Sequence, residues 1–247
     1  MLYRSEGIVI RAMDYGESHK IITLFTHNAG KVGVLVKGAK KVRSKHASLA
    51  QPFTYGEFVF TRHTGLGTLQ HGEIIESNHL LREHLDLSAH AAYIAELTEK
   101  AIPEEEVNHI HFNLIKGCFS ALHSGKDFEV VTHIYQLKLL ALAGYDPVVD
   151  SCIQCGQQQG AFRMSYYAGG ILCEKCARHD QSLTLLSDNV LKLLRFYKQI
   201  DLTRLGEINI SQATKTELTK VIHRLIDYQL GLKLKTRAFL DSLSKLN

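Results

Sequence analysis

The stretch Lys20-Ile21-Ile22-Thr23-Leu24-Phe25-Thr26 is followed, after Asn28-Ala29-Gly30, by Lys31-Val32-Gly33-Val34-Leu35-Val36-Lys37. Ile, Val, Phe and Thr are typical of β-strands, whereas Asn and Gly are typical of turns. The stretch therefore predicts two neighbouring strands joined by a short turn.

Similar short runs precede and follow this pair. The five predicted strands are Tyr3 to Arg11, Lys20 to Thr26, Lys31 to Lys37, Phe53 to Thr61 and Leu69 to Ser77. Five strands at roughly ten-residue spacing predict a small closed barrel, because closure removes exposed sheet edges. We expect an OB-type barrel over residues 1–78; an SH3-like barrel has a similar strand count and stays open as an alternative.

After about Asn78 the apolar residues follow helical spacing. The predicted helices are Leu80 to Leu97, Ile110 to Leu122, Ile134 to Leu142, Ser187 to Gln199, Ser211 to Tyr228 and Lys235 to Leu243. Pro103 and the acidic run Glu104-Glu105-Glu106 predict a turn and a helix start, since carboxylates favour the positive end of a helix dipole. These helices should form an all-α body.

The chain has five cysteines, and four of them have the spacing Cys152-x2-Cys155-x17-Cys173-x2-Cys176. This spacing is typical of a four-thiolate zinc site, with a hairpin in the longer gap. Four thiolates leave no position for water, so we expect one structural Zn²⁺. Cys118 is expected in the core, and His179 is expected to be a bystander near the site.

The predicted fold is therefore α+β and multi-domain. An OB-fold barrel covers residues 1–78, and a helical body covers residues 79–148 and 181–247. A four-cysteine zinc ribbon is inserted over residues 149–180.

The net charge of +4 is unevenly distributed along the chain. Residues 1–50 contain 9 basic and 3 acidic residues, a net charge of +6, while the rest contains 20 and 22, a net charge of −2. Such asymmetry favours a polyanion-binding face. Five of the cations lie within residues 37–45.

Lysine and arginine in such a loop neutralise phosphates without reading sequence. The predicted DNA-binding residues are Arg11, Lys20, Lys31, Lys37, Lys40, Lys41, Arg43 and Lys45. Five phosphate contacts on one strand predict a slope of about −3.5 for log K against log salt. A solvated basic loop without a ligand is the alternative interpretation.

Two further groups of residues extend this hypothesis. Candidate stacking platforms for bases are Tyr15, Phe25, Phe53, Tyr55, Phe58 and Phe60, although most alternate along strands as core residues do. A second basic group lies in the predicted C-terminal helices. It either extends the DNA-binding surface or forms a solvated helical face, and its members are Lys215, Lys220, Arg224, Lys233, Lys235 and Arg237.

Motifs of catalysis are missing from the sequence. Residues 33–40 place Lys wrongly for a phosphate loop, and Gly65-Leu66-Gly67-Thr68-Leu69-Gln70 lacks the last glycine of a dinucleotide motif. We find neither G-x-S-x-G nor H-E-x-x-H, and we therefore expect no enzyme. The N-terminus lacks the pattern of a signal peptide and no stretch is apolar enough to span a bilayer, so we expect a cytoplasmic, nucleoid-associated protein with no membrane partner.

The order of several short motifs resembles the RecO family of bacterial recombination mediators over essentially the whole chain. The motifs are Glu6-Gly7-Ile8-Val9-Ile10-Arg11, Asp14-Tyr15-Gly16-Glu17, Lys20 to Thr26, Gly30-Lys31-Val32-Gly33, Lys37-Gly38-Ala39-Lys40-Lys41, Gly65-Leu66-Gly67-Thr68-Leu69, the four cysteines, and Asp201-Leu202-Thr203-Arg204-Leu205-Gly206.

The resemblance implies a DNA repair and recombination mediator of the RecF pathway. Such a protein would bind single- and double-stranded DNA, anneal complementary strands, and act with RecR to help RecA displace single-strand-binding protein. The acidic tail of single-strand-binding protein is expected to bind the helical body. Two other classes stay open: an RNA-binding or RNA-modifying protein, and a zinc-ribbon scaffold that binds only proteins.

Overall fold

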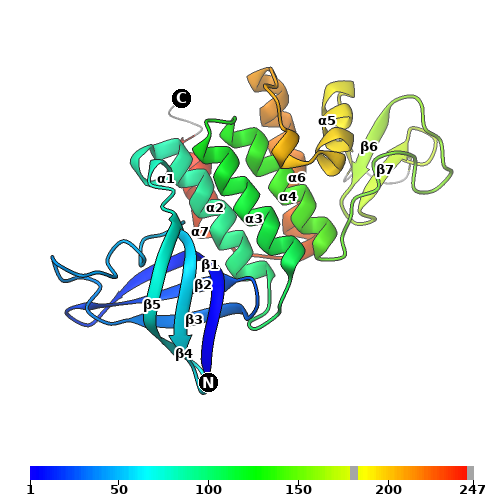
Figure 1. Cartoon of the computed structure of the whole chain (residues 1–247). Helices are drawn as coiled ribbons and strands as arrows, with labels where there is room; N and C mark the ends of the chain where they lie inside the picture. The colour runs from blue at the N-terminus through cyan, green and yellow to red at the C-terminus, as the bar shows by residue number, and fades with distance from the viewer. Residues whose placement is uncertain (179–182, 244–247) are drawn as a thin grey trace. The chain divides into compact units, whose positions relative to one another are not determined.

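The computed structural model describes residues 1–178 and 183–243, which form two compact units (Figure 1). The first unit contains residues 1–128 and the chain from Leu234 onward, and the second contains Glu129–Lys233. The chain thus leaves the first unit and returns to it. Within the described residues, a barrel, seven α-helices and a cysteine-containing hairpin confirm the α+β class. The four-part domain division stays a prediction.

Five strands of the first unit form a closed barrel. They are β1 Leu2–Tyr15, β2 His19–Thr26, β3 Gly30–Val36, β4 Tyr55–Thr61 and β5 Gly67–Glu76. Their order is β1-β2-β3-β5-β4, with β1 and β4 paired to close the sheet and β3 parallel to β5. This arrangement is the OB-type barrel, and the SH3-like alternative is excluded.

Alternation along the strands builds the barrel core. In β3, Val32, Val34 and Val36 are buried, while the residues between them are partly exposed. Phe58 and Phe60 of β4 belong to the same core cluster as these valines and are fully buried. The valines and phenylalanines explain why the strand pattern was readable in the sequence.

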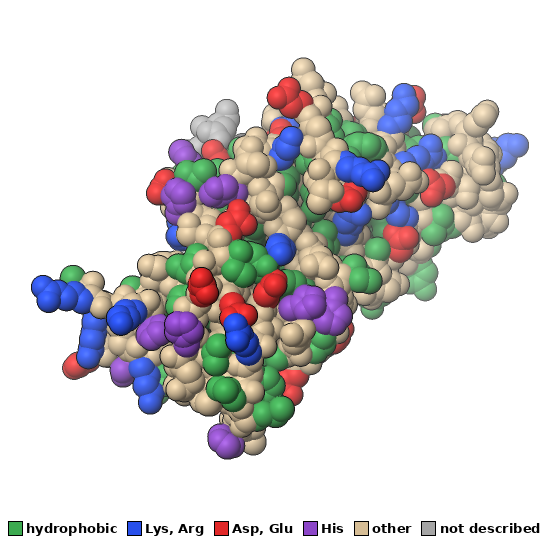
Figure 2. Space-filling view, in the orientation of Figure 1, with side chains coloured by type: hydrophobic (Ala, Val, Ile, Leu, Met, Phe, Trp, Pro, Cys, Tyr) green, Lys and Arg blue, Asp and Glu red, His purple; other side chains and the backbone are tan. Residues whose placement is uncertain are grey.

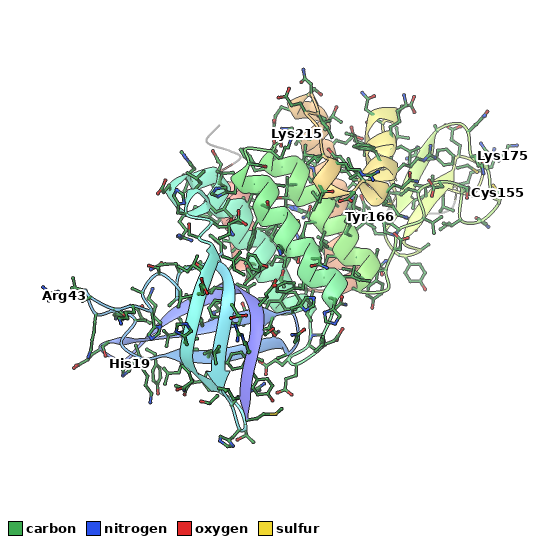
Figure 3. All side chains as sticks on the ribbon, in the orientation of Figure 1. His19, Arg43, Cys155, Tyr166, Lys175 and Lys215 are labelled. Carbon is green, nitrogen blue, oxygen red and sulfur yellow. The ribbon has the colours of Figure 1, made fainter. Side chains whose placement is uncertain are left out.

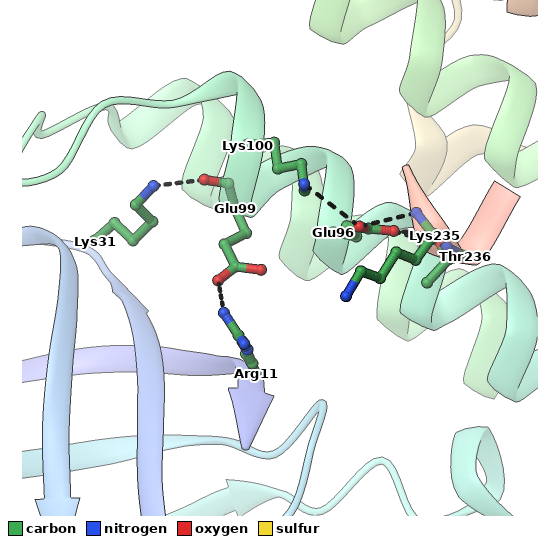
Figure 4. Close-up of polar contacts among 7 residues, drawn as sticks. All are labelled: Arg11, Lys31, Glu96, Glu99, Lys100, Lys235 and Thr236. Carbon is green, nitrogen blue, oxygen red and sulfur yellow. Dashed lines mark hydrogen bonds and ion pairs between the residues drawn. The ribbon is translucent and has the colours of Figure 1, made fainter. Parts of the chain in front are cut away.

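Four helices complete the first unit: α1 Leu80–Glu83, α2 Leu85–Ala101, α3 His109–His123 and α7 Lys235–Leu243. Helix α7 is joined to α2 by Glu96, whose carboxylate accepts hydrogen bonds from the backbone N–H of Lys235 (3.1 Å) and Thr236 (2.8 Å) (Figure 4). A carboxylate at a helix N-terminus satisfies donors that the helix leaves unpaired. Glu96 thereby anchors the returning end of the chain.

The turn predicted at Glu104-Glu105-Glu106 is present at Glu104 and Glu105, but the helix start predicted there is wrong. Helix α3 begins at His109 and is capped by Asn108, whose side chain accepts a hydrogen bond from the backbone N–H of His111 (2.9 Å). Glu105 instead has a φ of 65°, and its backbone N–H donates to the carbonyl of Lys31 (3.3 Å). Contact with the barrel therefore overrides the local preference of the carboxylates.

The second unit contains three helices and a small sheet. Its elements are α4 Phe128–Leu142, β6 Phe162–Ser165, β7 Gly170–Cys173, β8 Thr184–Leu185, α5 Asp188–Gln199, the 3₁₀ turn η1 Leu202–Arg204, and α6 Gln212–Leu230. Ser187 caps α5 as predicted, and Ser211 caps α6. Strands β6 and β7 form the predicted hairpin. Within the described residues, we find no helix long and apolar enough to cross a membrane.

Candidate nucleic-acid interface and metal centre

The basic residues of the barrel gather on the connection between β3 and β4, which we call the basic loop (residues 37–46). Lys37, Lys40, Lys41, Arg43 and Lys45 are all exposed there. Arg43 lies at the protruding end of this loop in Figure 3, and Figure 2 shows lysine and arginine gathered at the same end of the barrel, at the left of the view. The sequence prediction of a concentrated cationic surface is therefore matched by the placement of these five side chains.

The base of the basic loop is held on the β1–β2 hairpin. The backbone N–H of Gly38, which has a φ of 68°, donates to Nδ1 of His19 (2.9 Å). The N–H of Lys40 donates to the carbonyl of Ser18 (3.0 Å). Ala39 is buried in the barrel core. A fixed base therefore carries a protruding, charged tip.

Lys40 differs from the other four cations because it has an acidic partner. Its Nζ lies 2.9 Å from the carboxylate of Asp14. The hydrogen bond from Lys40 holds the pKa of Asp14 below its usual value. Four cations of the basic loop have no ion pair with another described residue: Lys37, Lys41, Arg43 and Lys45.

The other three predicted DNA-binding residues are not all beside the basic loop. Lys20 lies at the loop end of β2, opposite Asp14 and Val36. Arg11 forms an ion pair with Glu99 of α2 (2.8 Å), and Lys31 donates to the backbone carbonyl of Glu99 (Figure 4). Lys31 also donates to the carbonyl of Ile102 (2.8 Å). The structure therefore brings Lys20 to the loop and places Arg11 and Lys31 against α2.

Most of the aromatic candidates are in the core, as their alternation suggested. Five of them are buried: Phe25, Phe53, Tyr55, Phe58 and Phe60. Tyr15 is half exposed at the end of β1. Val42, between the loop cations, is fully exposed and was not singled out from the sequence.

The four cysteines of the second unit come together as the spacing predicts. Their sulfur atoms all lie within 4.8 Å of one another, and Sγ of Cys155 is 3.7 Å from Sγ of Cys173. Four sulfurs about 2.3 Å from a central ion at tetrahedral angles would be about 3.8 Å apart. The cluster therefore has the size that a tetrahedral metal ion requires, and the described residues contain no other group of three or more potential ligands.

Local backbone bonds shape both halves of this cluster. The N–H of Gly156, with a φ of 75°, donates to the carbonyl of Cys152 (2.8 Å), which turns the first pair back on itself. The N–H groups of Cys176 and Ala177 both donate to the carbonyl of Cys173. Each two-residue gap is thus a tight turn that aims two sulfurs at one point.

The thiols of the cluster differ in acidity. Burial raises the pKa of Cys152, but hydrogen bonds from the backbone N–H of Cys173, Cys155 and Gln154 outweigh it and lower the pKa to about 6. Burial and hydrogen bonds with the other three thiols raise the pKa of Cys176 to about 12. One thiolate is stabilised while the accumulation of further negative charge is opposed, so four thiolates together require a cation.

The two remaining predictions about this chemistry have different outcomes. Cys118 is buried on α3 in the first unit, which confirms its expected place in the core. His179 lies outside the described residues.

Comparison with known proteins gives a family match for the N-terminal and the C-terminal parts of the chain. Residues 1–78 match the family described as "Recombination protein O N terminal", and residues 82–238 match "Recombination protein O C terminal". The chain is 40% identical over 246 residues to a protein of Bacillus pumilus (strain SAFR-032) named "DNA repair protein RecO", covering 100% of this chain and 96% of that protein. Proteins of the same name from Bacillus velezensis (strain DSM 23117 / BGSC 10A6 / LMG 26770 / FZB42) and Bacillus subtilis (strain 168) are 41% and 40% identical, with the same coverage.

Proposed function

Because the chain belongs to the RecO family of DNA repair proteins, we propose that it binds single- and double-stranded DNA and anneals complementary strands. In this proposal the protein is a mediator of the RecF pathway and not an enzyme. It acts with RecR to help RecA load onto DNA coated by single-strand-binding protein, whose acidic tail contacts the helical body. DNA binding is the part of the proposal that has support from specific residues.

The observation that carries the proposal is the basic loop on the OB-type barrel. Lys37, Lys41, Arg43 and Lys45 are exposed and have no acidic partner in the described chain, so they are free to neutralise phosphates. Phosphate contacts of this kind tolerate any sequence, which annealing requires. Lys20 and Lys40 lie at the base of the loop and Arg11 and Lys31 near α2, where they would supplement these contacts.

We propose further that Cys152, Cys155, Cys173 and Cys176 hold one structural Zn²⁺. The ion would supply the positive charge that four clustered thiolates need, and it would fix the ends of the β6–β7 hairpin. Because all four positions of a tetrahedron are taken by sulfur, the cysteines hold the hairpin and leave no site for a substrate.

An annealing assay tests the function. Complementary DNA strands coated with single-strand-binding protein are mixed with the full chain without ATP, and matched RNA strands are tested in parallel. We expect faster annealing of DNA and retention of both single and double strands at low salt. Preference for RNA would favour an RNA-binding protein, and failure to retain either nucleic acid would leave a protein-binding scaffold.

A further inference from the structure

The tip of the β6–β7 hairpin and the outer face of α6 expose two aromatic rings in the second unit. Tyr167, in the turn of the hairpin, is 80% exposed, and Tyr228 of α6 is 57% exposed. Their ring centroids are 6.2 Å apart and their planes meet at 86°. In this edge-to-face contact the edge of one ring meets one face of the other, and the high exposure of both side chains leaves ring surface that a flat partner can approach.

Two cations lie on the same face of α6 as Tyr228. Lys220 and Arg224 precede Tyr228 by eight and four residues, the spacing that places side chains along one side of a helix. Both are exposed, and neither forms an ion pair with another described residue. Between Lys220 and Lys233 the chain carries three cations and one carboxylate, Asp227, so this segment is positively charged.

The arrangement is held in place by contacts beneath it. The guanidinium of Arg224 lies over the ring of Tyr166 (4.7 Å to the centroid) and donates to Oγ1 of Thr184 (3.0 Å). The hydroxyl of Tyr166, labelled in Figure 3, donates to the same oxygen (2.8 Å). Nε2 of Gln229 donates to the carbonyl of Tyr166 (2.8 Å), which ties the hairpin to α6. A surface already ordered in this way loses little entropy when it binds.

We propose that these four residues, Lys220, Arg224, Tyr167 and Tyr228, form a second contact for single-stranded DNA, which we call the ribbon–helix surface. An unpaired base stacks on the exposed face of Tyr167 or Tyr228, and Lys220 and Arg224 contact phosphates. Aromatic faces beside separate cations match a polymer that alternates bases and phosphates. The inference rests on the DNA binding proposed above and adds a place for a second strand, which annealing needs.

Tryptophan fluorescence tests the stacking directly, because the chain contains no tryptophan. In Tyr167→Trp the full chain has a single indole reporter at the proposed stacking position. Titration with oligo-dT is expected to quench it, while an oligomer of the same length with abasic sites, which keeps the phosphates, leaves it bright. Tyr145→Trp, at a position 46% exposed in the same unit, is the matched control and should not respond.

Two variants test what the surface contributes. Tyr167→Ala with Tyr228→Ala is expected to slow annealing at least about five-fold, the loss of one stacked base, with zinc content and circular dichroism unchanged. Lys220→Gln with Arg224→Gln is expected to make the salt slope shallower by about 1.4, the contribution of two phosphates on a single strand.

The outcomes separate this inference from the proposed function. If anisotropy shows DNA bound to the Tyr167→Trp chain while its indole is not quenched, and the double alanine variant anneals normally, the ribbon–helix surface is refuted and DNA binding stands. If an acidic peptide quenches the indole and oligo-dT does not, the surface binds protein and the inference is wrong. If no DNA is bound at low salt by the unmodified chain, both fail together.

Discussion

Neutralising the tip of the basic loop provides the sharpest test of the proposal that the barrel binds DNA. The variant replaces Lys37, Lys41, Arg43 and Lys45 by glutamine, because these four side chains have no acidic partner among the described residues. It leaves Lys40, whose ammonium lies 2.9 Å from the carboxylate of Asp14 and is already neutralised in part. The base of the loop, held by His19 and Ser18, is unchanged.

The size of the effect follows from the number of free cations. Each phosphate contact on a single strand contributes about −0.7 to the slope of log K against log salt, so four contacts contribute about −2.8. The five contacts counted from the sequence correspond to about −3.5, and the pairing of Lys40 with Asp14 accounts for the difference. Between about 50 and 200 mM salt, the unmodified chain should lose about 50-fold more affinity than the variant.

Fluorescence anisotropy of a labelled single strand, measured at several salt concentrations, supplies both slopes. The single substitution Lys40→Gln is the matched control and should change the slope by less than about 0.7, the value for one free phosphate contact. An equal slope for the variant and the unmodified chain would refute the assignment of the loop. A large effect of Lys40→Gln would show that the Asp14 pair opens when DNA binds.

Three further predictions concern the metal, pH and the backbone. Elemental analysis should find one zinc per chain. The variant Cys173→Ser should lose the zinc and the amide-exchange protection of the β6–β7 hairpin, whereas the control Cys118→Ala should retain both. Metal-free protein with four titratable thiols would contradict the proposed zinc site. Burial lowers the pKa of His111 from 6.5 to about 4, so the unfolded chain binds a proton at higher pH than the folded chain does. The contribution of neutral His111 to the free energy of unfolding should therefore be complete above about pH 6.5 and fall by up to about 3 kcal/mol toward pH 4. In urea unfolding, His111→Gln should not show this fall in the free energy of unfolding between about pH 6.5 and about pH 4. If the variant keeps the same pH dependence, the fall comes from other groups. Gly30→Ala should cost at least about 2 kcal/mol, because a Cβ there meets the backbone of Glu105 at 2.6 Å in addition to the strain of a φ of +66°; Gly16→Ala, with a φ of +59° and open space, should cost about 1 kcal/mol in the same thermal unfolding assay.

Features that depend on local pattern were predictable from the sequence. The strands of the barrel were visible because Val32, Val34 and Val36 repeat with the period of a pleated strand. The metal centre was visible because a gap of two residues, as between Cys152 and Cys155, lets the chain turn back so that both sulfurs reach one ion. Ser187 likewise marked the start of α5, since a cap acts on the next turn of its own helix.

Features that depend on distant contacts were not predictable in this way. Arg11 and Lys40 have the same charge in the sequence as Arg43, and only folding brings Glu99 and Asp14 to the first two. The acidic run at Glu105 failed to start a helix because Lys31, far back in the chain, holds its backbone. Tyr167 and Tyr228 are likewise separated by the whole of α5 before they meet.

The return of α7 to the first unit has a consequence for how the protein is made. Glu96 of α2 accepts hydrogen bonds from the backbone N–H groups of Lys235 and Thr236, and these residues are translated after the whole of the second unit. On the ribosome, the barrel can close as soon as β5 has emerged, but the helices beside it stay incomplete until residues 235–243 have left the exit tunnel. Since domains generally fold as units during synthesis, we expect the second unit, with its four-cysteine cluster, to fold before the first unit is complete.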